Sequence, residues 1–96
     1  MIRHGDVVLR SVNSIPKNAC LLKNRKELAY GEVTGHAHRL DVGELFETKD
    51  GKLYCRITKD AQLSHEEHKN ITILPGEYEV IIKRQYTPTG WMKVVD

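Results

Sequence analysis

The chain has 96 residues, with 15 Lys and Arg against 13 Asp and Glu and a formal net charge of +2. This length predicts a single domain spanning residues 1–96. This positive excess is too small to imply nucleic-acid binding. No run reaches the roughly 20 apolar residues that cross a bilayer. Because Met1 is followed by no apolar leader either, we expect a soluble, cytoplasmic protein in which Cys20 and Cys55 are free thiols.

Short apolar runs separated by turn residues predict strands along the whole chain. In order, these runs cover residues 5–12, 20–22, 27–34, 36–42, 45–48, 53–58, 62–65, 70–74, 77–84 and 91–95. Segments 20–22 and 62–65 are either short strands or turns. The pattern predicts an all-β fold, a small barrel or sandwich of seven or eight short, mostly antiparallel strands. At most one short helical turn is expected, near residues 60–68.

Two dipeptides mark connections between these strands. Asp50-Gly51 predicts a hairpin turn in which both central residues have positive φ. Pro75-Gly76 fits the central positions of a type II turn. After the first of these turns Leu53, Cys55 and Ile57 alternate with polar residues and are expected to face the core.

The first of two histidine pairs is His36-Ala-His38. Residues two apart on a strand point the same way, and this face continues as Leu40 and Val42. Both imidazoles are therefore expected to look inward, where one metal ion can reach both.

The second pair is His65-Glu66-Glu67-His68. If the two glutamates form a two-residue turn, the histidines oppose each other across a hairpin about 5 Å apart. In one helical turn they would share a face as well. Glu-Glu is poor chemistry for a primed turn, so we expect a looser loop. His68 can face the same core as Ile71 only if the strand is irregular at Lys69 or Asn70.

The four histidines of these pairs, His36, His38, His65 and His68, predict one divalent transition-metal site. Imidazole donors suit Zn, Ni, Cu, Fe or Mn and disfavour Mg and Ca. Four ligands would close a tetrahedral site, whereas three would leave a position for water, as catalysis requires. Candidates for the general base near such a site are Glu67, Glu66, Glu32 and Glu44, in that order.

His4 is a further candidate for a catalytic role, although an exposed histidine near the terminus is the simpler expectation. Three arginines, Arg3, Arg39 and Arg84, are candidates for contacts with an anionic substrate, and a solvated side chain is the simpler expectation for each.

Gly31, His36, His38 and Glu44 resemble the first motif of the cupin family, G-x5-H-x-H-x3/4-E-x6-G. Here Gly31 and His36 are separated by four residues and Glu44 lies late. The resemblance implies a metal-binding small β-barrel. The segments GDVVL, GEVTGHAH, HEEH and LPGEYEV are also similar to small uncharacterised proteins from bacteria and phages.

These patterns lead to three hypotheses. The first is a metal-dependent hydrolase acting on a phosphoester or a nucleotide. The second is a non-catalytic module that binds a protein or RNA, with structural histidines. The third is a metal-free ribonuclease that uses a histidine pair for acid–base catalysis. In each case an exposed edge strand would favour a homodimer.

Overall fold

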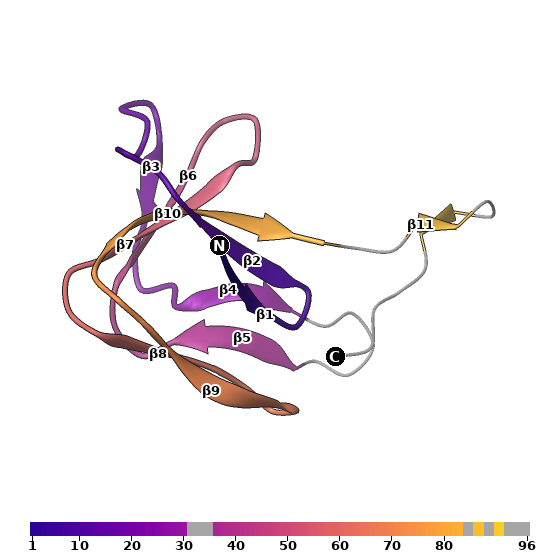
Figure 1. The fold of residues 1–96 in the computed structure, drawn as a ribbon. Coiled ribbons are helices and arrows are strands. Elements are labelled where there is room, and N and C mark those ends of the chain that lie inside the picture. The colour runs from indigo at the N-terminus through magenta and orange to yellow at the C-terminus, as the bar shows by residue number, and fades with distance from the viewer. Residues whose placement is uncertain (31–35, 84–85, 88–89, 92–96) are drawn as a thin grey trace.

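The computed structural model describes residues 1–30, 36–83, 86–87 and 90–91, and the regular structure in these segments is entirely β (Figure 1). A six-stranded sheet has the order β1 (Ile2–His4), β2 (Val7–Ser11), β10 (Gly76–Ile82), β7 (Leu53–Ile57), β6 (Glu44–Glu47), β3 (Cys20–Leu22). A four-stranded sheet has the order β4 (Glu27–Tyr30), β5 (Ala37–Leu40), β8 (Ala61–His65), β9 (His68–Ile73). Strands β11 (Tyr86–Thr87) and β12 (Gly90–Trp91) pair separately.

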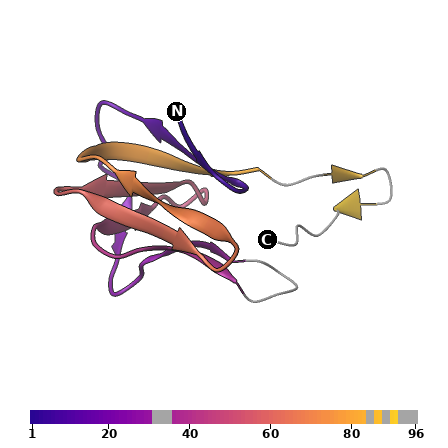
Figure 2. The same ribbon diagram turned by 60° about the horizontal axis from the view of Figure 1, so that its bottom comes forward.

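The predicted all-β class is confirmed, and its form is a small sandwich (Figures 1 and 2). The two main sheets together hold ten short strands, more than the seven or eight expected, and every pairing within them is antiparallel. The helical turn expected near residues 60–68 is wrong, because this segment forms β8, a turn and the start of β9. Within the described segments, no helix has the length and apolar character to span a membrane.

The core lies between the two sheets. On the six-stranded side, the register aligns Tyr78, Cys55, Leu45 and Leu22 in one row across four strands. The first three are buried, and Leu22 packs against the same cluster. The predicted inward face of Leu53, Cys55 and Ile57 is confirmed, because all three are at most 7% exposed. The four-stranded sheet contributes Leu28, Ala29, Leu40, Ala61, Leu63 and Ile73 to the same core.

The N-terminal segment is a hairpin rather than the single strand expected over residues 5–12. Gly5 and Asp6 form a two-residue turn, and His4 pairs with Val7 across it. Gly5 has φ +62°, whereas Asp6 does not have positive φ. Positive φ at the first central residue alone is the pattern of a type II′ turn, which matches the twist of the flanking strands. This turn directs His4 and Asp6 toward the four-stranded sheet.

The two connections predicted from dipeptides differ in detail from the expectation. Thr48 O accepts from the Gly51 amide at 3.0 Å, so Lys49 and Asp50 are the central residues and only Gly51, with φ +87°, has positive φ. This is the three-residue hairpin loop with a glycine bulge. Gly76 has φ +156°, far from the roughly +80° of a type II turn. Pro75-Gly76 instead carries the chain from β9 in one sheet to β10 in the other.

Candidate metal centre

Three histidines form one row across the four-stranded sheet. Strands β5 and β8 pair Arg39 with Ser64 and Leu40 with Leu63, and continuing this register by one residue brings His38 opposite His65. His65 in turn pairs with His68 across the β8–β9 hairpin. The ring centroids of His38 and His65 are 4.4 Å apart, and those of His65 and His68 are 4.6 Å apart. The row therefore follows directly from strand register.

An irregularity in β9 turns His68 toward this row. Leu63 pairs with Ile71 and His65 with His68, so one residue on β8 opposes two on β9, Lys69 and Asn70. The predicted irregularity at these two residues is confirmed. The expected looser loop is wrong, because Glu66 and Glu67 form a two-residue turn. Neither glutamate has positive φ, so the turn is not a primed one.

His4 reaches the row from the other sheet. It is 4% exposed, so the expectation of an exposed terminal histidine is wrong. Its ring centroid lies 5.0 Å from that of His38 and 5.4 Å from that of His68. Asp6, from the same hairpin, is 8% exposed and lies 3.1 Å from His38 through Oδ1 and Nε2. The dipeptide Gly5-Asp6, directly before the apolar run Val7-Val8-Leu9, was the sequence signal for this hairpin, and no expectation had included Asp6.

These groups form a hydrogen-bonded chain. His38 Nε2 donates to Asp6 Oδ1, and His4 Nε2 donates to the carbonyl oxygen of Lys69 at 2.8 Å. The two Nδ1 atoms of His4 and His38 face each other at 2.9 Å. Burial lowers the pKa of His4, and the neighbouring His68 and His65 lower it further. The hydrogen bond to the Lys69 carbonyl acts in the opposite direction and raises this pKa. A neutral His4 protonated on Nε2 directs its Nδ1 lone pair at His38.

His36 lies beside the row, just before β5. Its Nδ1 is 2.8 Å from Glu67 Oε2, and its ring centroid is 5.6 Å from that of His65. Glu66 accepts hydrogen bonds from the Ala37 amide and from Arg39, and these bonds, the Ala37 bond foremost, lower its pKa to about 2. Both candidate bases therefore lie at the edge of the histidine row, as exposed residues of its hairpin turn.

The other candidate residues are distributed differently. Arg39 is exposed and forms ion pairs with Glu27 and Glu66 at 3.7 and 3.2 Å. Arg3 is exposed and its Nε donates to the Gly5 carbonyl. Glu44 lies on β6 in the opposite sheet, 3.7 Å from Arg56, so the acid of the cupin-like pattern does not join the histidines. Arg84 and Glu32 lie outside the described residues.

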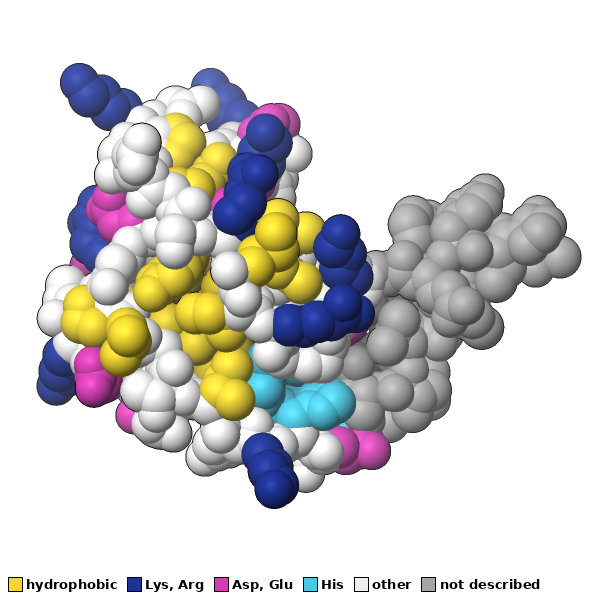
Figure 3. Space-filling view, viewed as in Figure 1, with side chains coloured by type: hydrophobic (Ala, Val, Ile, Leu, Met, Phe, Trp, Pro, Cys, Tyr) yellow, Lys and Arg dark blue, Asp and Glu magenta, His cyan; other side chains and the backbone are white. Residues whose placement is uncertain are grey.

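Two groups of side chains have the donor spacing of a metal site. Ligand atoms of His38, His65 and His68 lie within 4.8 Å of one another, and so do those of His36, His65 and Glu66. The first group is all nitrogen, and two of its members are buried. Histidine side chains reach the surface beneath a band of apolar side chains in the face shown in Figure 3. Within the all-nitrogen group, His38 and His65 are buried and His68 is half-buried, so the group reaches solvent at His68.

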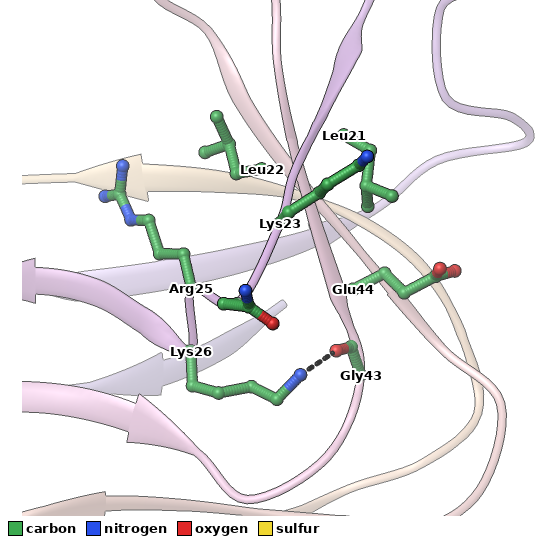
Figure 4. A pocket seen from close by; sticks show the side chains of 8 residues that line it. Leu21, Leu22, Lys23, Arg25, Lys26, Gly43 and Glu44 are labelled. Carbon is green, nitrogen blue, oxygen red and sulfur yellow. Dashed lines mark hydrogen bonds between the residues drawn. The ribbon is translucent and has the colours of Figure 1, made fainter.

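A separate pocket lies away from the histidines. It is lined by Leu21, Leu22, Lys23, Asn24, Arg25, Lys26, Gly43 and Glu44 (Figure 4). Lys26 Nζ donates to the Gly43 carbonyl at 2.9 Å, which holds the β3–β4 connection against the start of β6. No histidine lines this pocket, so it is separate from the histidine row.

Comparison with known proteins places the chain in one family. Residues 3–83 match the model of a domain of unknown function, DUF8820. The chain belongs to this family. The matched range includes all five histidines and Asp6. No curated protein and no solved structure matches the chain.

Proposed function

We propose that this chain is a transition-metal-binding domain whose ion is held by His38, His65 and His68. The observation that carries the proposal is the all-nitrogen row, in which three ring nitrogens lie within 4.8 Å of one another. The row is formed by backbone register on three adjacent strands, so its side chains are preorganised rather than gathered by a flexible loop.

The residues fit such an ion chemically. Imidazole nitrogen binds zinc at about 2.0–2.1 Å, and a tetrahedral ion would require the three rings to close inward by rotation of their side chains. A ligating histidine commonly donates its other N–H to a carboxylate or carbonyl, which fixes its tautomer. His38 has such a partner in Asp6. His65 Nδ1 instead accepts from the Glu67 amide at 3.0 Å, and a His65 bound to the ion through Nε2 would give up this bond. Nitrogen donors without a bound carboxylate favour zinc, nickel, copper or iron over magnesium and calcium.

Hydrolysis of a phosphoester or a nucleotide is the second candidate function. The three-nitrogen group favours it, because three protein ligands leave one position that water can take. A bound ion would lower the pKa of that water to about 7. Glu66 and Glu67 lie on the turn that joins two of the ligands, and Glu67 is the better candidate for a general base. Glu66 accepts from Ala37 and Arg39, and its lowered pKa makes it the weaker base. Arg39, between Glu27 and Glu66, is placed to contact an anionic substrate.

Metal analysis of untagged protein tests the first function. We expect about one equivalent of a transition metal per chain and a lower melting temperature in excess chelator, because an ion that binds only the folded state stabilises it. Less than about a tenth of an equivalent after reconstitution, with an unchanged melting temperature, would exclude the metal centre. Activity on a chromogenic phosphodiester that is lost in chelator would support hydrolysis. Activity that persists there would point to the metal-free histidine mechanism.

A further inference from the structure

The fourth ligand of this centre can be assigned from hydrogen bonds in the second sheet. We infer that His4 binds the same ion through Nδ1 and closes a four-nitrogen centre, and that Asp6 is a positioning residue that fixes the tautomer of His38. This inference rests on the proposed metal site at His38, His65 and His68. Such a centre would join the two sheets of the sandwich. Because four protein ligands close a tetrahedral ion, this inference and the hydrolase hypothesis, which needs an open position, exclude each other.

The tautomers of the two facing rings carry the argument. A carbonyl oxygen accepts hydrogen bonds but cannot donate them, so His4 Nε2, 2.8 Å from Lys69 O, bears a proton. A carboxylate is likewise an acceptor, so His38 Nε2, 3.1 Å from Asp6 Oδ1, bears one too. In neutral imidazoles the remaining Nδ1 atoms carry lone pairs, and here they face each other at 2.9 Å. Two facing lone pairs repel, so a cation must lie between them: either a proton, which makes one ring an imidazolium that donates to the other, or a metal ion.

The surroundings indicate that this cation is the shared metal ion. An ion bound to His38 Nδ1 lies next to His4 Nδ1, since the two atoms are 2.9 Å apart. Both rings then donate their outer N–H to an oxygen acceptor, which is the common arrangement for histidine ligands. The alternative, an ion at His38 Nε2, would break the bond to Asp6 and leave the facing lone pairs in place.

The arrangement of the four rings agrees with one centre. In a tetrahedral ion with four imidazoles, metal–nitrogen bonds of about 2.0–2.1 Å place the ring centroids about 5 Å apart. The six distances among His4, His38, His65 and His68 run from 4.4 to 6.5 Å. His36 is outside this set, with its Nδ1 on Glu67. Gly5 approaches closely enough that a Cβ there would meet His68 Nε2 at 2.7 Å, so the hairpin packs directly on the row.

Metal titration of the full chain tests the inference. Zinc affinity is measured by chelator competition for the wild type, His4→Gln and Asp6→Asn. Glutamine retains an N–H group of the kind that reaches Lys69 O but has no ring nitrogen. His36→Gln tests whether His36 is a ligand in place of His4. Asp41→Asn is the carboxylate control for Asp6→Asn, because Asp41 is exposed and accepts a hydrogen bond from the Gln62 amide. Circular dichroism of each metal-free variant checks folding.

We expect His4→Gln to weaken zinc binding by at least about 100-fold and Asp6→Asn by about 10- to 100-fold, the range for outer partners of ligands. His36→Gln and Asp41→Asn should change it by less than about threefold, because neither side chain is a ligand in the four-nitrogen set or a hydrogen-bond partner of His4 or His38. In ¹⁵N spectra of zinc-bound protein, His4 and His38 should both carry a proton on Nε2 and none on Nδ1.

Three results would overturn the assignment. In the first, zinc binds the wild type but His4→Gln binds it equally well. In the second, His36→Gln weakens binding as much as His4→Gln does. In the third, the zinc-bound form keeps a proton on His4 Nδ1. Each of these leaves the proposed metal site standing, whereas a wild type that binds no metal at all removes both. If His4→Gln fails to fold, the ¹⁵N spectrum of the wild type still decides the ligand set.

Discussion

Replacing Gly5 by alanine is expected to damage the histidine centre more than the fold. Gly5 precedes Asp6 in the turn that faces the row, and its φ is +62°. An alanine Cβ there would lie 2.7 Å from His68 Nε2 and 3.0 Å from His38 Cε1. The substitution therefore adds a backbone penalty and a contact with two proposed ligands.

The magnitudes can be separated. Left-handed backbone costs an L-residue about 1–2 kcal/mol, and the lower entropy of the unfolded alanine chain offsets about 0.4–1 kcal/mol. The net backbone effect is then about 1 kcal/mol, or about 4–8 °C in Tm for a chain of this size. Restoring ordinary contact at 3.4 Å requires a shift of 3.4 − 2.7 = 0.7 Å at His68 Nε2. A displacement of this size in a ligand should weaken zinc binding by about tenfold or more.

Gly51→Ala is the matched control. Gly51 also has positive φ, +87°, but nothing lies within 4 Å of the position that a Cβ would take there. We expect it to lose about 1 kcal/mol in urea unfolding while its zinc affinity, measured by chelator competition, stays unchanged. Gly5→Ala should lose more stability than the control and should alone lose affinity. Equal affinities in the two variants would refute the close packing of the hairpin on the histidines.

Four further predictions concern packing, thiol reactivity and ionisation in the sandwich. Leu45→Ala, at a fully buried position, should lower the free energy of unfolding by about 2–5 kcal/mol, whereas Leu74→Ala, at 62% exposure, should leave it nearly unchanged in the same urea titration. Thiol reagent should modify exposed Cys20 at once and buried Cys55 only on unfolding. Burial raises the pKa of Cys55 from 9.0 to about 12. The stability that the protonated thiol contributes is therefore present below pH 9.0 and is lost as the pH rises toward 12. Comparing the unfolding free energies of wild type and Cys55→Ala across this pH range measures the loss. The pKa of Glu66 is lowered from 4.5 to about 2, chiefly by the hydrogen bond from the Ala37 amide. In acid unfolding, the wild type should therefore be more stable than Glu66→Gln above pH 4.5, and this difference in stability should vanish as the pH falls toward 2.

The class of fold and the meeting of His65 with His68 follow from the order of residues along the chain. Alternation along Leu53, Cys55 and Ile57 requires a strand with one buried face, since side chains on a strand point to opposite sides in turn. The spacing of His65 and His68 brings their rings together in any compact turn. Regular alternation would place His68 and Ile71 on opposite faces of one strand, and this conflict predicted the irregularity in β9 at the correct residues. Each of these conclusions depends on residues a few positions apart.

How the centre is completed depends instead on the packing of one sheet on the other. His4 and Asp6 come from a hairpin in the six-stranded sheet, whereas His38, His65 and His68 come from the four-stranded sheet. Periodicity describes one strand at a time and contains no information on which sheet packs against it. The same reason explains why Glu44, close to His38 in the chain, lies with Arg56 instead. Register within a sheet is a local property of neighbouring strands, but the meeting of two sheets depends on the packing of the whole core.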